Sequence, residues 1–126
     1  MKKCIKCNRT LALKNYSLDR RNKDGLVNTC KRCVADRDLR RNYGLSLADK
    51  KALEASQGGC CVICGNNWHS LQVDHDHRHC RRAISCGGCV RGLVCGPCNS
   101  GLGFFRDSPH LLRSAADYLE RRGCAS

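Results

Sequence analysis

The sequence is poor in aromatic residues and has no long apolar segment. Only 5% of its 126 residues are Phe, Trp or Tyr, too few to fill a large conventional core. No apolar run approaches the roughly 18 residues of a membrane-spanning helix, so we expect no membrane partner. The first residues, MKKCIKCNRT, carry positive charge without an apolar segment behind them, which argues against a secretory signal. Something other than a large core must stabilise a fold of this length.

Acidic residues are also scarce, and the charge is unevenly distributed. The chain has 23 Lys and Arg against 11 Asp and Glu, a formal charge of +12, of which residues 1–45 carry +9. The change in charge coincides with a linker-like segment, Tyr43-Gly44-Leu45. We therefore predict two modules, residues 1–45 and residues 46–126. A strong positive charge favours a polyanionic partner.

Cysteine, by contrast, is abundant. The 13 cysteines are odd in number, so they cannot all pair as disulfides. Ten of them form five C-x-x-C pairs, a spacing that lets two thiolates of one tight turn bind a single tetrahedral Zn²⁺. The pairs are Cys4/Cys7, Cys30/Cys33, Cys61/Cys64, Cys86/Cys89 and Cys95/Cys98. This pattern predicts an intracellular zinc protein rather than a secreted disulfide scaffold.

The pairs predict two structural zinc sites and suggest a third. Cys4, Cys7, Cys30 and Cys33 would form a basic zinc-ribbon-like module with short strands over residues 10–18 and 26–29 and a helix from Val34 that ends at Gly44. The second site would use Cys61, Cys64, Cys95 and Cys98. A third, Cys3His site could use His79, Cys80, Cys86 and Cys89; a hairpin with free thiols remains the alternative. Cys60 and Cys124 fall outside these sets.

The second module reads as a small α+β unit stabilised by zinc. A helix begins at the N-cap Ser46, with Asp49 completing a capping box, and ends near Gln57. Short strands are expected over residues 71–73 and 90–94, followed by a helix from about Cys98 to Phe105. A last helix begins at Ser108-Pro109, with apolar residues at helical spacing.

The second zinc site would bring Asp74 and His75 close to Asn99, since it joins the strand after Cys64 to the helix after Cys98. A carboxylate and an amide oxygen suit Mg²⁺ or Mn²⁺. An imidazole beside such a metal can activate water, and the metal can neutralise charge on a phosphate. A basic protein with this set is expected to hydrolyse a phosphodiester bond.

These motifs, taken in order, resemble the recombination endonuclease VII family of phage-type HNH, or His-Me finger, nucleases, over about residues 43–120. The resemblance rests on Gln57-Gly58-Gly59, the two knuckles at Cys61 and Cys95, Asp74-His75-Asp76-His77 and Asn99. It implies a ββα-metal core with flanking helices. It also implies that His75 is the general base, that Asp74 and Asn99 bind Mg²⁺ or Mn²⁺, and that His77 contacts the phosphate or supports the metal.

The remaining expectations concern partners. Candidate DNA contacts are Arg32, Arg37, Arg40, Arg41 and Arg91, although the helical arginines could equally form a solvated face. The substrate would be duplex or branched DNA, and further partners a second copy of the chain or phage packaging or recombination proteins. The resemblance implies a cytoplasmic location in a phage-infected bacterium. The alternative is a non-catalytic, zinc-containing nucleic-acid-binding accessory protein.

Overall fold

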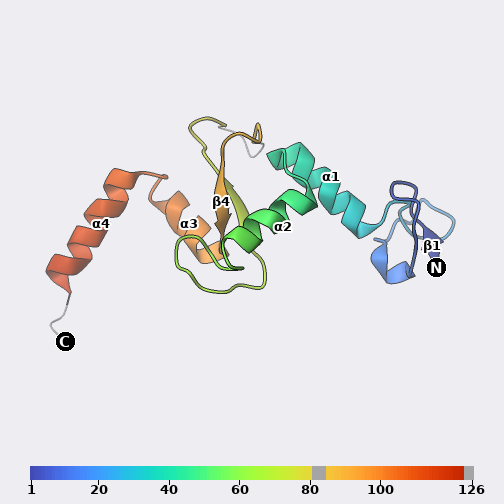
Figure 1. Ribbon diagram of the computed structural model, residues 1–126, viewed down its shortest axis with the longest axis horizontal. Coiled ribbons are helices and arrows are strands. Elements are labelled where there is room, and N and C mark those ends of the chain that lie inside the picture. Colours follow the sequence, from blue (N-terminus) through green and yellow to red (C-terminus); the bar gives the residue numbers. More distant parts are fainter. Residues whose placement is uncertain (81–84, 124–126) are drawn as a thin grey trace.

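The computed structural model describes residues 1–80 and 85–123, so the predicted extra thiol at Cys124 lies outside the described part. Figure 1 shows an elongated molecule, with a loop-rich N-terminal module at one end, a β-hairpin with helices in the middle and helix α4 at the other end. The elements are β1 (Lys2–Lys3), β2 (Thr10–Leu11), η1 (Leu13–Asn15), α1 (Lys31–Tyr43), α2 (Leu47–Ser56), β3 (Gln72–His75), β4 (Val90–Val94), α3 (Gly96–Phe104) and α4 (Pro109–Arg122).

The N-terminal module contains much less strand than the sequence predicts. Its β1 and β2 pair over only two residues each, and an isolated bridge between Leu18 and Leu26 is all that remains of the predicted longer strands. Side chains take the hydrogen bonds that a strand ladder would use: Asn22 Nδ2 donates to the Leu26 carbonyl, and the Leu26 N–H donates to Asp24 Oδ1. The prediction over residues 10–18 and 26–29 was therefore wrong in extent.

Helix α1 ends where the sequence predicts and begins earlier. Cys30 is its N-cap, and its first residue, Lys31, lies three residues before Val34, the first residue of the predicted helix. Gly44 ends the helix in the left-handed conformation at φ 66°, and its N–H donates to the Arg40 carbonyl. Asp36 and Arg40, one turn apart on the helix, form an ion pair at 2.8 Å.

Helix α2 joins α1 to the hairpin. The predicted capping box at Ser46 and Asp49 is confirmed, and the Leu47 N–H donates to Asp36 Oδ1 on α1. Beyond the end of α2, the Gln57 side chain makes paired hydrogen bonds with β4: it donates to the Leu93 carbonyl and accepts from the Leu93 N–H, both at 2.9 Å. Leu93 is fully buried, so Gln57 satisfies its backbone where water cannot.

Strands β3 and β4 and helix α3 form a ββα unit. The strands are antiparallel, with Gln72 opposite Val94 and Asp74 opposite Gly92. The core of this unit is small and contains Cys61, Leu71, Val73, Leu93, Val94 and Cys95, with Leu39, Tyr43, Leu45 and Leu53 packed against it. Two of its six buried residues are predicted zinc ligands, which agrees with the shortage of aromatic residues.

Helix α4 begins at the predicted N-cap, Ser108, whose side chain accepts from the Leu111 N–H. It extends away from the hairpin (Figure 1), and its Tyr118 and Leu119 are exposed. The apolar spacing seen in the sequence thus leaves these side chains in solvent. No helix in residues 1–80 and 85–123 is long and apolar enough to cross a membrane.

We expect Gln57→Ala to lower the free energy of unfolding by about 2 kcal/mol, because the buried Leu93 N–H would lose its side-chain partner and the Leu93 carbonyl would keep the 3.2 Å bond from the Val62 N–H but lose the one from Gln57. Urea unfolding with saturating zinc measures this change. The matched control is Ser56→Ala at the end of α2, where an exposed hydroxyl bonds only to the Leu53 carbonyl. Equal stabilities of the two variants would show that Gln57 does not join α2 to β4.

Candidate functional site

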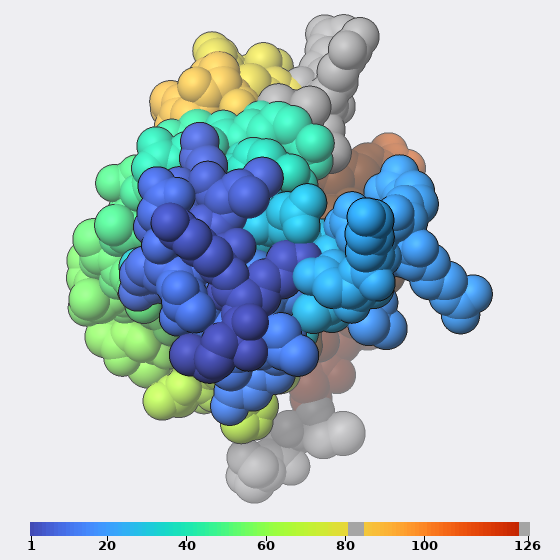
Figure 2. Space-filling model, turned by 90° about the vertical axis from the view of Figure 1, so that its right-hand side faces the viewer, coloured from blue at the N-terminus to red at the C-terminus, as the bar shows by residue number. Residues whose placement is uncertain are grey.

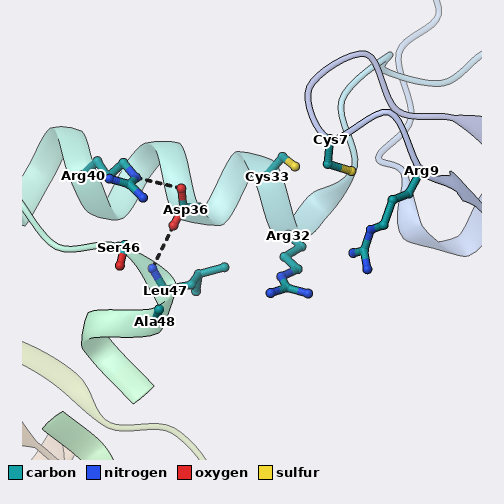
Figure 3. Close-up of a pocket in the computed structure, with 9 residues that line it drawn as sticks. All are labelled: Cys7, Arg9, Arg32, Cys33, Asp36, Arg40, Ser46, Leu47 and Ala48. Atoms are coloured by element: carbon teal, nitrogen blue, oxygen red, sulfur yellow. Dashed lines mark hydrogen bonds and ion pairs between the residues drawn. The ribbon is translucent and has the colours of Figure 1, made fainter. Parts of the chain in front are cut away.

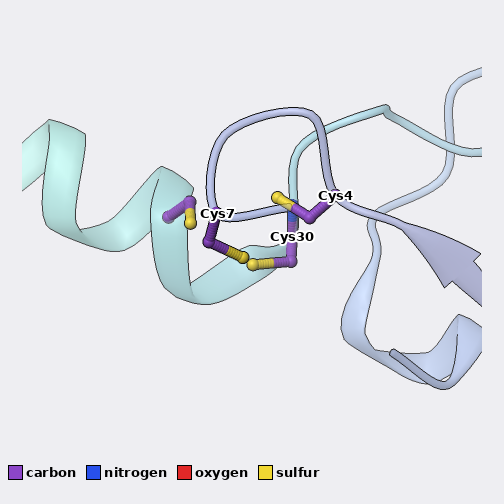
Figure 4. Close-up of side chains that lie close together, drawn as sticks. Cys4, Cys7 and Cys30 are labelled. Atoms are coloured by element: carbon purple, nitrogen blue, oxygen red, sulfur yellow. The ribbon is translucent and has the colours of Figure 1, made fainter. Parts of the chain in front are cut away.

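Two groups of four cysteines have the geometry of tetrahedral zinc sites. They are Cys4, Cys7, Cys30 and Cys33, of which Figure 4 labels three, and Cys61, Cys64, Cys95 and Cys98; within each group the sulfur atoms all lie within 4.8 Å of one another. Four thiolates about 2.3 Å from one zinc lie about 3.8 Å apart. The Cys64 and Cys95 sulfurs are 3.9 Å apart. Both groups therefore fit zinc, as the sequence predicts.

The two clusters have the same architecture. In each, the first C-x-x-C pair lies in a loop and is followed by a residue in the left-handed conformation, Asn8 at φ 57° or Gly65 at φ 71°. The N–H of that residue donates to the carbonyl of the first cysteine of its pair. The second pair begins a helix, with Cys30 the N-cap of α1 and Cys95 the N-cap of α3. A helix N-terminus favours the negative charge of a thiolate.

Backbone N–H groups prepare part of each cluster for metal. Those of Cys30 and Cys7 lower the pKa of Cys4 to about 6. Burial opposes ionisation of Cys61, but the N–H groups of Cys64 and Cys95 outweigh it and lower its pKa to about 6. Burial raises the pKa of Cys33 to about 12. Zinc binding must therefore displace protons from the clusters.

The structure also brings together His79, Cys80, Cys86 and Cys89, whose ligand atoms lie within 4.8 Å of one another. His79 Nδ1 is 3.4 Å from Cys80 Sγ and 3.5 Å from Cys86 Sγ. This group lies in the loop between β3 and β4. His79 and Cys86 are exposed, and Cys89 is buried.

The predicted catalytic residues Asp74 and His75 lie at the end of β3, at a β-bulge. Asp74 faces Gly92 and His75 faces Val90, so Arg91 is the extra residue on β4. Bulges of this kind redirect side chains next to active sites. Here Arg91 Nε is 2.7 Å from Asp74 Oδ2, and Arg91 Nη2 is 3.0 Å from Asp74 Oδ1.

Arg91, a predicted DNA contact, is therefore engaged with acidic side chains in this structure. Its Nη2 also lies 3.4 Å from Asp107 Oδ2. Asp74 is 6% exposed, and a carboxylate so buried needs a counter-charge. The Asp74 side chain raises the pKa of Arg91 further, so the guanidinium stays charged.

Asn99 lies in the first turn of α3 and approaches β3 from the same side as Asp74. Its Nδ2 donates to Gln72 Oε1 at 2.8 Å. Gln72 and Asp74 are two residues apart on one strand, so their side chains point to the same face. With Nδ2 engaged, the amide oxygen of Asn99 can face a cation. One carboxylate and one amide oxygen fit Mg²⁺, which takes its other ligands from water and phosphate.

His75 is nearly buried and contacts two rings. Its ring centroid lies 5.9 Å from that of Tyr43, at the end of α1, and 4.3 Å from that of His77. His77 is exposed. The Arg78 backbone N–H donates to Asp76 Oδ1 and lowers the pKa of Asp76, so this carboxylate stays ionised and shapes the turn after His75.

The basic residues of α1 are mostly paired with acids on the same helix. Arg40 pairs with Asp36, and Arg37 and Arg41 approach Asp38 at 3.1 and 3.8 Å. Arg32 belongs to none of the ion pairs found within residues 1–80 and 85–123.

Arg32 instead lines a pocket of about 370 Å³ between the first cluster and the start of α2. Figure 3 shows the side chains of Arg9 and Arg32 pointing toward the same space, while Arg40 turns to Asp36. Ser46, Leu47 and Ala48 at the start of α2 also line the pocket, as does the Asp36 carboxylate. Two guanidinium groups beside a helix start form a surface suited to an anion.

Sequence reasoning missed three residues of the site. Gln72 could have been found from its position two residues before Asp74 on a predicted strand. Arg9 follows the first knuckle directly, which is a weak signal for a role beside Arg32. The contact of Tyr43 with His75 joins two predicted modules, and no local pattern indicates it.

Comparison with known proteins places the chain in a family. A sequence model of the recombination endonuclease VII family matches residues 35–121. The chain belongs to the recombination endonuclease VII family. The match begins within α1 and includes β3, β4 and all of α3, and it identifies the chain as a nuclease-family protein. The resemblance inferred from the motifs is thereby confirmed.

Two individual proteins are similar to this chain. The Gene 59 protein of Mycobacterium phage D29 is 39% identical over 83 residues, which are 63% of this chain and 46% of that protein. The chain thus spans about half the length of this curated relative. The crystal structure of the ββα-Me type II restriction endonuclease Hpy99I superposes with a TM-score of 0.40 and 24% identity, covering 94% of this chain and 64% of Hpy99I.

We expect Arg91→Ala to bind Mn²⁺ about tenfold more tightly in the absence of DNA, because a metal ion would no longer compete with the guanidinium for Asp74. Electron paramagnetic resonance of free Mn²⁺, with zinc-saturated protein, measures the affinity. Arg78→Ala removes an equal charge from the adjacent exposed turn and should change the affinity little. If the two variants bind Mn²⁺ equally, general electrostatics rather than the Asp74 ion pair governs metal binding.

Proposed function

We propose that this protein is an HNH-type, metal-dependent DNA endonuclease that hydrolyses phosphodiester bonds. One set of contacts supports the proposal: in a chain of this nuclease family, Asp74 and His75 lie at the end of β3, and Asn99 of α3 bonds to Gln72 on the same strand. Two Cys4 zinc sites would be structural, because four thiolates leave no open coordination position for water. The catalytic metal would be Mg²⁺ or Mn²⁺.

Asp74 and the amide oxygen of Asn99 would hold the catalytic metal. When bound, this ion supplies positive charge that neutralises the scissile phosphate and the leaving oxygen. Asp74 must exchange at least one of its two contacts with Arg91 to accept it. Asp107 is already 3.4 Å from Arg91 and offers the displaced guanidinium a second carboxylate.

His75 would remove the proton from the attacking water. The water oxygen bonds to phosphorus as the bond from phosphorus to the 3′ oxygen breaks, leaving a 5′-phosphate and, after protonation, a 3′-hydroxyl. The contact with Tyr43 holds the imidazole in place from α1. The exposed His77, in contact with the His75 ring, provides a route for the proton to solvent.

The N-terminal module would bind the DNA backbone. Arg9 and Arg32 form its strongest candidate phosphate site, because both point into one pocket and Arg32 belongs to none of the ion pairs found within residues 1–80 and 85–123. Arg37, Arg40 and Arg41 share their charge with Asp36 and Asp38 and would contribute less. The similarity to a mycobacteriophage protein supports a phage origin.

One observation favours the accessory-protein alternative. Arg91 engages both oxygens of Asp74, and a guanidinium held there permanently would leave the carboxylate unable to bind metal. Under that reading the chain would bind nucleic acid without cutting it.

We expect His75→Ala to slow nicking of supercoiled plasmid in Mg²⁺ by about 10²–10⁴-fold, the usual contribution of a general base. Zinc content and DNA affinity should not change. His69→Ala, which alters an exposed loop histidine, is the matched control. Cleavage by His75→Ala at the wild-type rate would disprove the mechanism, and a wild-type protein that does not nick with Mg²⁺ or Mn²⁺ would favour the accessory role.

We expect Arg32→Ala to weaken duplex binding and to reduce the slope of log affinity against log salt by about 0.9, the value for one lost phosphate contact. Fluorescence anisotropy over a salt series measures both. Arg21→Ala is the control, since Arg21 is exposed and its guanidinium donates two hydrogen bonds to the Asp19 carboxylate. An unchanged slope for Arg32→Ala would place the phosphate contacts elsewhere.

A further inference from the structure

The loop between β3 and β4 contains a metal-ligand set that the proposed reaction does not use. Three sulfurs and one imidazole nitrogen, from Cys80, Cys86, Cys89 and His79, lie within 4.8 Å of one another. All four residues belong to the described part of the chain. Three thiolates and an imidazole are a standard tetrahedral zinc set, and their softness excludes Mg²⁺ and Ca²⁺.

The backbone of the loop supports these sulfurs as it does in the Cys4 clusters. The Cys86 N–H donates to Cys80 Sγ at 3.3 Å. In the first cluster the Cys30 N–H donates to Cys4 Sγ at 3.3 Å, and in the second the Cys98 N–H donates to Cys95 Sγ of its own pair at 3.4 Å. The loop thus carries the same N–H to sulfur bond as the two clusters assigned to zinc.

Cys89 has an additional partner that is itself buried. Ser85 is 4% exposed, and its hydroxyl lies 3.0 Å from Cys89 Sγ. The same oxygen accepts the Gly87 N–H at 3.0 Å, which fixes the turn between Cys86 and Cys89. Gly87 adopts φ 88° in this turn, a conformation that favours glycine.

The loop lies directly on the C-terminal end of α1. In Figure 1 the loop reaches the end of α1, and in Figure 2 its yellow and orange atoms lie against the turquoise atoms of that helix. The Ser85 N–H donates to the Asn42 carbonyl. A Cβ on Gly44 would lie 2.8 Å from the Gly87 Cα, so the contact requires glycine on α1's side.

The other side of the loop is bonded to the turn that carries His77. The Asp76 N–H donates to the Cys89 carbonyl at 2.9 Å, and the His79 and Cys80 N–H groups both donate to the Asp76 carbonyl. The four ligands therefore lie between α1, which supplies Tyr43, and the strand that supplies His75.

We propose that His79, Cys80, Cys86 and Cys89 bind a third zinc ion, which fixes the β3–β4 loop against the end of α1. The zinc orders the turn between Cys86 and Cys89, and this turn forms the docking surface for Asn42 and Gly44. By positioning the end of α1, the zinc would also position Tyr43 against His75, and this effect on catalysis rests on the proposed function. The metal site and the docking do not depend on it.

Native mass spectrometry of the full chain tests the metal site. We expect three zinc ions in the wild type and two in Cys80→Ser and in Cys86→Ser. Cys60→Ser is the matched control and should retain three, because Cys60 belongs to none of the three ligand groups. A wild type with only two zinc ions overturns the proposal, as does a mass lower by two hydrogens, which indicates a disulfide in this loop.

Hydrogen exchange tests the docking. We expect exchange in residues 39–45 to rise by about tenfold or more in Cys80→Ser, since loss of the ordered turn frees the end of α1. Gly87→Ala should raise it as well while retaining three zinc ions, because its Cβ would lie 3.4 Å from the Gly44 Cα at a strained φ. Unchanged exchange in both variants would disprove the docking role.

These readouts separate the two proposals. Zinc count and exchange are measured without DNA, so a wild type with three zinc ions that fails to cut DNA would refute the endonuclease and leave the third site intact. A wild type that cuts DNA but binds only two zinc ions would refute the third zinc site and leave the endonuclease proposal intact.

Discussion

The fold depends on thiolate clusters that tie loops to helix starts. The Cys30 N–H bonds to the sulfur of Cys4, 26 positions earlier in the sequence. The sulfurs of Cys64 and Cys95 lie close together although these residues are 31 positions apart. Around them the apolar core is small, with Cys61 and Cys95 among its six buried residues. Structural zinc contributes roughly 10–16 kcal/mol in small finger peptides, comparable to the whole stability of an ordinary domain, about 5–15 kcal/mol. A chain built this way can leave Tyr118 and Leu119 in solvent and still fold.

The sequence contains enough local information to predict the parts of the fold that depend on spacing. The C-x-x-C pattern predicts the same three ligand groups that the structure assembles, since tetrahedral coordination imposes a short-range rule. Capping residues predict the starts of α2 and α4 for the same reason. The prediction of the N-terminal strands was wrong in extent because the side chains of Asn22 and Asp24 bond to the backbone of Leu26. The pattern of apolar residues does not reveal that side chains compete for these backbone groups. The division at residues 45 and 46 stays a prediction, and Tyr43 and Leu45 pack against the core of the second module.

The contacts of Asp74 could not be predicted from the local sequence, because they depend on the register in which β3 and β4 pair. A single extra residue on β4 places Arg91 beside Asp74, and the position of that bulge is known only when the two strands are paired. The sequence marks Arg91 as a basic residue, from which a DNA contact follows naturally. The structure instead makes it the counter-charge of a buried carboxylate. Under the proposed function, the same ion pair keeps the site closed to metal until a stronger cation displaces the arginine.

Under the proposed function, the length of α1 sets the distance between the phosphate site at Arg32 and the catalytic site beside Tyr43. Arg32 and Tyr43 lie eleven residues apart on one unbroken helix, and at 1.5 Å per residue the helix separates them by about 16 Å. Successive base pairs rise by about 3.4 Å along the duplex axis, so this separation corresponds to about five of them. The helix would thus set the distance along the DNA between the cleaved phosphodiester bond and the phosphate bound by Arg32. A residue inserted into α1 would lengthen that measure by about 1.5 Å and rotate the grip by about 100° around the helix axis.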